Sequence, residues 1–188
     1  MAPDVSMLTC STARLVLRPF RLEDFDAYSF YHQREDVYRF LYSTPPAAEA
    51  LRANFEAAMQ PGLARAGDAL HLAVERIEDA AVIGEVLLKL ADGAAMQAEI
   101  GYIFNPRYGG SGYATEAVEA TIGIGCRVFG FHRIFARIDT LNHGSVGIAE
   151  RLGLRREAHF IENDRFDGVW GDEFVYATLA REWQASRA

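Results

Sequence analysis

The sequence predicts a mixed α/β protein built on a mostly antiparallel sheet. Three strand-like runs, 69–77, 81–90 and 94–104, follow one another with short turns between them, which is typical of an antiparallel meander. The unit 98–140 then has the pattern strand, helix, strand, and it is long enough for a parallel crossover. We therefore expect one parallel strand pair in this sheet, with a ligand cleft beside it.

Length and composition favour a single domain over 1–188. The chain has 188 residues, half of them hydrophobic, which is enough to bury a sizeable core. It carries 19 basic and 26 acidic side chains, so its net charge is −7. An acidic surface repels phosphate backbones, which argues against nucleic-acid binding and suits a cationic or amine-bearing small partner.

Other classes of protein are also disfavoured. No stretch approaches the roughly 20 apolar residues that span a bilayer, and the first ten residues do not resemble a secretory signal, so no membrane partner is expected. Cys10 and Cys126 lie far apart and form no disulfide framework, which favours a reducing, cytoplasmic setting. The five histidines lack metal-ligand spacing, so we expect no metal.

The first third of the chain predicts one strand and two helices after a loose start. Residues 14–18 alternate apolar and polar side chains into a proline, which indicates a short strand. Residues 22–32 have acidic side chains in their first turn and predict a helix. Residues 47–59 are rich in Ala, Leu and Glu and predict a second helix, which Pro61 and Gly62 end.

The second half adds a long helix and the rest of the sheet. In the third strand of the meander, one face carries Ala98, Ile100, Tyr102 and Phe104. A helix is expected from Tyr113 to about Phe129, closed by a glycine. The elements expected after it are a strand over 133–140, a helix over 144–152, and strands over 155–166 and 172–179.

A glycine-rich loop over 107–112 joins the third meander strand to the long helix. Glycines let the backbone approach a ligand closely, and a helix start offers unpaired N–H groups, so together they favour phosphate binding. A P-loop requires a Lys after its glycines, and none follows here. A dinucleotide fingerprint requires Gly or Ala in its last place, where this chain has Thr115. A turn followed by a helix cap is the simpler structural interpretation, and it remains open here.

The spacing of this loop resembles the acetyl-CoA motif of the GNAT acetyltransferase superfamily. The segment has Arg107, two further residues, Gly110, one residue and Gly112, followed by Tyr-Ala-Thr-Glu-Ala. It comes after the strand sequence Glu-Ile-Gly-Tyr that begins at Glu99. The resemblance implies a mixed sheet that is splayed between the family's fourth and fifth strands, with helices on both faces.

Two further segments resemble one branch of that superfamily, the ribosomal-protein N-terminal (alanine) acetyltransferases. Residues 14–24 resemble its first strand and helix, and Asn142-His-Gly-Ser145 resembles its Asn-x-x-Ser helix. The resemblance covers about 12–181 of the chain. It implies an enzyme that moves an acetyl group from acetyl-CoA to a primary amine by direct attack.

The resemblance also implies how the chain holds CoA. The pyrophosphate would bind the N–H groups of 110–114, and the pantetheine arm would pair with the strand edge at 102–104. The residues implied in cofactor binding are Tyr102, Ile103, Phe104, Arg107, Gly109, Gly110, Ser111, Gly112, Tyr113, Ala114, Thr115, Asn142 and Ser145.

Two side chains are the candidates for proton transfer. Glu99 matches the family position that often serves as the base, although a solvated strand-end glutamate has the same pattern. The resemblance implies Ser145 as the acid, because the Ser of the branch's Asn-x-x-Ser helix lies near the CoA sulfur; many family members carry a Tyr in this region, but no Tyr lies between Tyr113 and Tyr176 here. Glu116 is explained by the dipole of the helix start, and Asn142 also suits a helix N-cap.

The acceptor is a protein N-terminus or a small-molecule amine, and the chain is expected to be a monomer or a homodimer. The alternative function is a non-catalytic acyl-CoA-binding sensor of the same fold. CoA release in the presence of amines separates the two. A nucleotide-binding module is a third possibility, which the missing Lys and the missing third glycine disfavour.

Overall fold

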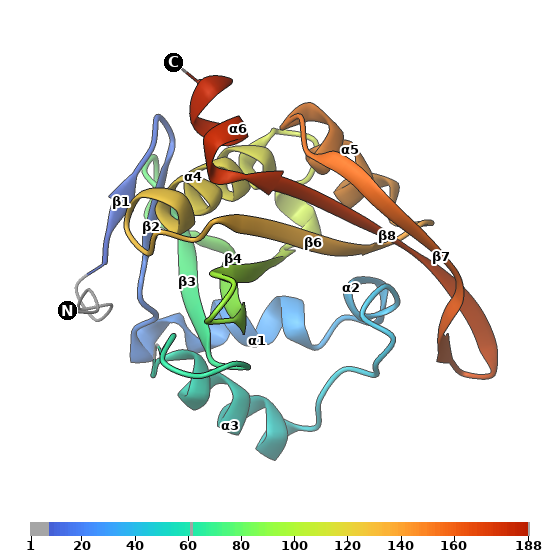
Figure 1. The fold of residues 1–188 in the computed structure, drawn as a ribbon. Helices are drawn as coiled ribbons and strands as arrows, with labels where there is room; N and C mark the ends of the chain where they lie inside the picture. The colour runs from blue at the N-terminus through green and yellow to red at the C-terminus, as the bar shows by residue number, and fades with distance from the viewer. Residues whose placement is uncertain (1–7, 61, 188) are drawn as a thin grey trace.

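One mixed sheet forms the centre of the computed structural model, which describes residues 8–60 and 62–187 (Figure 1). Among these residues the sheet has eight strands in the order β1-β2-β3-β4-β5-β6-β8-β7. All neighbours are antiparallel except β5 and β6, so the predicted meander and its single parallel pair are confirmed. The strands are β1 (Cys10–Ser11), β2 (Leu15–Arg18), β3 (Ala69–Arg76), β4 (Val82–Asp92), β5 (Gln97–Phe104), β6 (Arg133–Asp139), β7 (Arg155–Phe166) and β8 (Val169–Leu179).

Helices cover both faces of the sheet, as the resemblance implied. Neighbouring residues of β3 show how the faces divide: Leu72 packs in one buried cluster with Ile122 of α4, and Ala73 packs in another with Tyr31 of α1 and Phe55 of α3. None of the helices in the described residues is long and apolar enough to cross a membrane. They are α1 (Phe25–His32), α2 (Glu35–Tyr38), α3 (Ala48–Ala58), α4 (Tyr113–Arg127), α5 (His143–Arg151) and α6 (Ala180–Ala185), with short 3-10 turns at Leu22–Asp24 and Pro106–Tyr108.

The structure differs from the prediction at short elements. The strand β1, the four-residue helix α2 and the six-residue helix α6 were not predicted, because such segments are too short to show a hydrophobic period. The predicted helix over 22–32 begins as a 3-10 turn, and β8 begins three residues earlier than expected. Helix α4 ends at Arg127, so Val128 lies beyond it and is 42% exposed.

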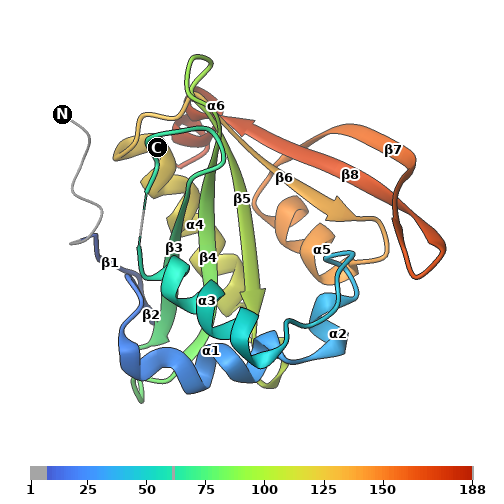
Figure 2. The same cartoon turned by 90° about the horizontal axis from the view of Figure 1, so that it is seen from below.

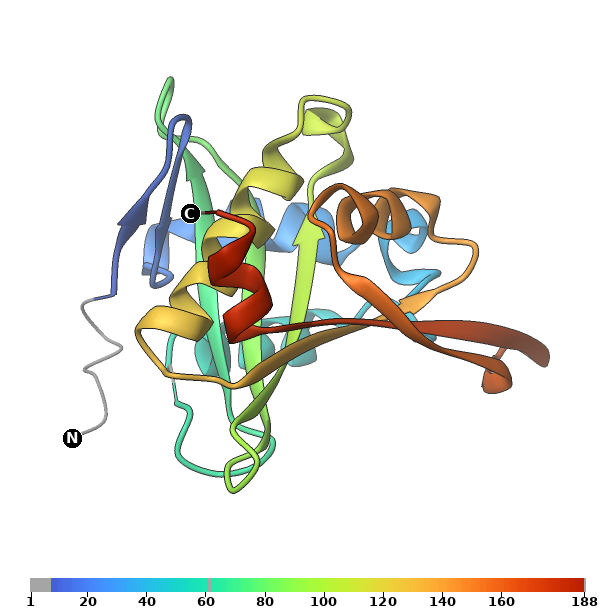
Figure 3. The same cartoon turned by 45° about the horizontal axis from the view of Figure 1, so that its top comes forward.

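The parallel pair is splayed, as the family resemblance implied. Strands β5 and β6 pair only at three positions, from Gln97 with Arg133 to Glu99 with Phe135. Beyond that point β5 continues to Phe104 beside β4, and β6 continues to Asp139 beside β8, without pairing with each other. Figures 2 and 3 show the two strands together at one end and separating toward the other. Counted from β2, these are the fourth and fifth strands, and the splay opens a gap in the sheet.

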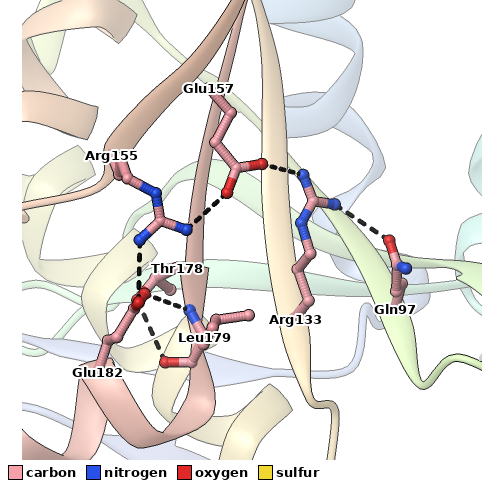
Figure 4. Close-up of polar contacts among 7 residues, drawn as sticks. All are labelled: Gln97, Arg133, Arg155, Glu157, Thr178, Leu179 and Glu182. Carbon is pink, nitrogen blue, oxygen red and sulfur yellow. Dashed lines mark hydrogen bonds and ion pairs between the residues drawn. The ribbon is translucent and has the colours of Figure 1, made fainter.

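A chain of polar contacts ties four elements together at the closed end of the splay (Figure 4). Arg133 on β6 donates to Gln97 of β5 at 3.1 Å and to Glu157 of β7 at 2.6 Å. Arg155 donates to the other oxygen of Glu157 at 2.6 Å and to Glu182 of α6 at 2.9 Å. These contacts hold β5 and β6 together at the end where their ladder begins.

Candidate active site

A cavity of about 640 Å³ lies beside the open end of the splay. Its walls come from the end of β5, the glycine-rich loop, the start of α4, the start of α5 and the α2 region. The residues implied in cofactor binding that line it are Tyr102, Ile103, Phe104, Gly109, Gly110, Gly112, Tyr113, Ala114, Thr115, Asn142 and Ser145. The fold thus brings together two segments that are separated in the sequence by residues 116–141, namely 102–115 and 142–145.

The glycine-rich loop presents backbone N–H groups to this cavity. Gly110 and Gly112 have φ values of 77° and 78°, a left-handed conformation that favours glycine. The first backbone bond of α4 runs from Glu116 N–H to the Gly112 carbonyl. Among the described residues, no acceptor is recorded for the N–H groups of 110–115. A row of free donors at the start of a 15-residue helix is a site that attracts a phosphate.

Thr12, Arg14 and Glu116, which we call the clamp, contact one another and hold the glycine-rich loop in place. Glu116 accepts hydrogen bonds from the Thr12 hydroxyl at 2.6 Å and from the Arg14 backbone N–H at 2.9 Å. Arg14 forms an ion pair with Glu116 at 2.7 Å and donates to the Ser111 carbonyl at 2.9 Å. Partial burial raises the pKa of Glu116, but these donors outweigh it and hold that pKa below its usual value. Glu116 therefore has a positioning role that the helix dipole alone did not reveal.

Arg107 and Ser111 do not line the cavity, although both were implied in cofactor binding. The Arg107 guanidinium lies 4.5 Å from the centre of the Phe30 ring on α1. Ser111 contributes its carbonyl to the clamp just described, since it accepts a hydrogen bond from Arg14.

Two contacts fix the start of α5, one made by the Asn142 side chain and one made by the Tyr102 hydroxyl. The Asn142 side chain caps this helix by accepting a hydrogen bond from the Ser145 N–H at 3.1 Å, as the N-cap interpretation predicted. The Tyr102 hydroxyl reaches across the splay and donates to the Ser145 carbonyl at 3.4 Å. Burial raises the pKa of Tyr102. The family resemblance implied a role for the Tyr102 backbone only; the contact of its phenol with α5 spans 43 positions, so no local pattern in the sequence predicts it.

Comparison with known proteins gives the family of this domain. The acetyltransferase (GNAT) domain model matches residues 14–155, which is most of the chain. The chain belongs to the GNAT acetyltransferase family. This is the superfamily that the glycine-rich loop resembles, so that part of the prediction is confirmed.

Two relatives of this GNAT domain are named as N-acetyltransferases. An uncharacterized N-acetyltransferase, YnaD, from Bacillus subtilis (strain 168) is 28% identical over 173 residues, which are 92% of this chain and 98% of the relative. The probable N-acetyltransferase YjcK of the same strain is 33% identical over 110 residues, which are 58% of this chain and 61% of the relative.

Solved GNAT structures have the same architecture. A GNAT-family acetyltransferase from Bacillus anthracis superposes with a TM-score of 0.83 at 28% identity, covering 93% of this chain and 100% of the other. Spermidine N-acetyltransferase from Vibrio cholerae, solved with CoA and spermine, superposes with a TM-score of 0.80 at 18% identity, covering 92% and 99%. At that identity, the likeness concerns the fold.

Glu99 lies away from the cavity of this GNAT domain. It belongs to the last paired position of β5 and β6, opposite Phe135 and beside Lys89 of β4, and its side chain points to the α1 and α3 face. Ile103 follows four residues later, which corresponds to about 13 Å along a strand. Glu99 is not among the residues that line the cavity. A proton from the cavity would need a chain of water molecules to reach it.

The α2 region forms a further wall of the cavity. Asp36 and Val37 of α2 line the cavity, together with Phe40 and Leu41 just after it. We call the segment 35–41, which carries these four lining residues, the acceptor wall; α2 lies at the open end of the splay (Figure 2). The sequence alone does not single out these four residues, since the segment has neither a hydrophobic period nor a motif.

Proposed function

We propose that this GNAT domain transfers an acetyl group from acetyl-CoA to a primary amine. One observation carries the proposal: a single cavity combines free N–H groups at the start of α4 with the unpaired edge of β5. The N–H groups of 110–114 suit the pyrophosphate of CoA. The edge of β5 at 102–104 suits its amide-rich pantetheine arm, which would bind like an added strand.

The cavity also fits the groups that CoA carries. Gly110 has open space where a side chain would stand, with no atom within 4 Å of an added Cβ, so a phosphate can approach the backbone. Arg151 of α5 lines the same cavity and lies 3.4 Å from the Thr115 hydroxyl at the start of α4. A guanidinium beside this helix start is suited to a further phosphate oxygen.

In the proposed reaction, the amine nitrogen attacks the carbonyl carbon of the thioester, forming the C–N bond as the C–S bond breaks. A backbone N–H near Ile103 or Phe104 stabilises the charge that develops on the carbonyl oxygen. Glu99 accepts the proton of the amine through water. The hydroxyl of Ser145, or that of Tyr102 beside it, protonates the leaving thiolate.

The acceptor is proposed to be a protein N-terminus or a small-molecule amine. The segments around 14–24 and 142–145 support the ribosomal-protein alanine acetyltransferase branch, and spermine in a structural neighbour illustrates a polyamine. We further propose a single domain that acts in the cytoplasm as a monomer or a homodimer. The cysteines Cys10 and Cys126, both free in the described structure, suit a reducing compartment.

The first experiment measures CoA release from acetyl-CoA in the presence of spermine, a peptide with N-terminal alanine, an amino sugar and free amino acids. We expect amine-dependent release of the CoA thiol and a product heavier by one acetyl group in the mass spectrum. Acetyl-CoA binding without turnover on this panel would refute the proposal and favour the acyl-CoA sensor.

Substitutions test the proposed proton transfers. Glu99→Gln should lower kcat by about tenfold or more while the affinity for acetyl-CoA holds, because only the base is removed. Lys89→Gln changes the charge on the neighbouring β4 residue and serves as the matched control. Ser145→Ala and Tyr102→Phe each remove one hydroxyl, and the acid is the one whose loss lowers kcat. If Glu99→Gln keeps the wild-type turnover at every pH, Glu99 is not the base.

A further inference from the structure

A buried carboxylate lies on the face of the sheet covered by α1 and α3, away from the proposed chemistry. Glu85 of β4 is 2% exposed, and one of its oxygens lies 3.4 Å from Nε2 of His32 on α1. The same oxygen lies 3.9 Å from Nδ1 of His71 on β3. Within the described residues, the second oxygen of Glu85, Nε2 of His32 and Nδ1 of His71 all lack a hydrogen-bond partner, so these two contacts are close approaches and not hydrogen bonds. Burying such a group costs free energy, so its presence calls for a reason.

Glu85 is ionised in this setting. Burial raises its pKa, but the imidazoles of His32 and His71 outweigh this effect and hold the pKa below its usual value. A carboxylate facing Nε2 favours the His32 tautomer that carries its proton there. In a neutral imidazole of that form, Nδ1 is free to accept a hydrogen bond.

The other nitrogen of His32 continues the contact to α2. Nδ1 lies 2.7 Å from the hydroxyl of Tyr38, the last residue of that helix. Burial and the charge of Glu85 raise the pKa of Tyr38 to about 12, so the phenol keeps its proton. With the His32 proton on Nε2, this hydroxyl donates to Nδ1. The contacts therefore run from the sheet through α1 to α2.

Helix α2 needs such an anchor. It has four residues, and an isolated helix of that length is unstable in water. It also carries Asp36 and Val37 into the cavity as part of the acceptor wall. At the other end of the contacts, Glu85 is the cross-strand neighbour of Ile103, the residue beside which the thioester is proposed to lie. The buried contacts thus connect the reacting strand to the opposite wall.

We propose that Glu85, His32 and Tyr38 form a relay of positioning residues that holds the acceptor wall at the distance from β5 that the amine requires. The role in amine binding rests on the proposed function. The effect of these three residues on the order of α2 can be tested without turnover. The relay touches neither acetyl-CoA nor the amine, since none of its three members lines the cavity.

The first test is hydrogen exchange on the full-length protein, followed by mass spectrometry. Tyr38→Phe removes one hydroxyl, and Glu85→Gln removes the charge at nearly constant volume. Each should speed exchange in 34–41 about fivefold, the factor that corresponds to the loss of ~1 kcal/mol, and leave α3 unchanged. Tyr31→Phe is the matched control, because its buried hydroxyl has no partner among the described residues. Equal exchange in all these proteins overturns the relay.

The second test is steady-state kinetics with acetyl-CoA and either spermine or the peptide with N-terminal alanine. Tyr38→Phe should raise the KM for the amine about fivefold, with kcat and the KM for acetyl-CoA within about twofold of wild type. The double variant with Glu85→Gln should be no worse than either single variant, because both act through His32. A KM for the amine that matches Tyr31→Phe refutes the positioning role. Absence of turnover in the wild type refutes the proposed function, and the exchange result then decides the relay by itself.

Discussion

Replacing Gly84 with alanine should displace the strand on which the thioester is proposed to lie. Gly84 of β4 pairs with Phe104 of β5. A Cβ added at this position would stand 2.5 Å from the Ile103 carbonyl oxygen and 2.9 Å from the Phe104 Cα. Both neighbours are backbone atoms, so no side-chain rotation relieves the contact. The end of β5 must move away from β4 by roughly 0.5–1 Å to restore normal contact distances.

This displacement sets the size of the expected effects. Overpacking of this kind costs about 1–3 kcal/mol. For a protein of 188 residues, that corresponds to a Tm lower by about 2–12 °C. Because a misplacement of about 1 Å can cost about 100-fold in rate, kcat/KM for acetyl-CoA should fall by about 10- to 100-fold. Calorimetry measures the change in Tm, and the rate of CoA release gives kcat/KM for acetyl-CoA.

Gly101 provides the matched control on the neighbouring strand. A Cβ added there would meet only the Leu87 side chain, at 3.2 to 3.4 Å, and that side chain can yield by a few tenths of an ångström. Gly101→Ala should therefore keep a Tm within about 2 °C of the wild type and a nearly normal kcat/KM. The reasoning is refuted if Gly84→Ala has the Tm and kcat/KM of the wild type, or if the two variants behave alike.

Two further predictions concern the glycine-rich loop and its clamp. Gly112→Ala should cost about 1–2 kcal/mol, because φ is +78° at this position, and should weaken CoA binding in titration calorimetry. Gly130→Ala, at φ +68° beyond the far end of α4, should cost similar stability and leave CoA binding unchanged; equal CoA affinities for the two variants would contradict this prediction. Glu116 has a lowered pKa in the folded state, so its contribution to stability is present above the unfolded pKa of about 4.3 and is lost as the pH falls through the folded-state value. In urea unfolding, the stabilities of Glu116→Gln and wild type should thus differ most near neutral pH and converge in acid, and a difference that does not change with pH would argue against the clamp.

Much of the fold could be predicted because the signals are local. The alternation in β5 placed Ile100 and Tyr102 on one face, and the glycines before Tyr113 placed the start of α4 at the observed residue. Three strands separated by short turns predicted their own antiparallel order. The short helices α2 and α6 escaped prediction because tertiary contacts stabilise them, as the contact between Tyr38 and His32 illustrates.

Interactions between neighbouring residues set the strands of the meander, the start of α4 and the conformation of the glycine-rich loop before it, and these were readable from the sequence. The tertiary structure alone decided where β5 and β6 separate, that the Tyr102 hydroxyl meets Ser145, and that Glu85 lies buried beside His32. The physical reason is the range of the interactions. Backbone conformation and periodicity are set within a few residues, whereas the cavity and its buried polar contacts join residues far apart in the chain and exist only once the sheet and helices have packed.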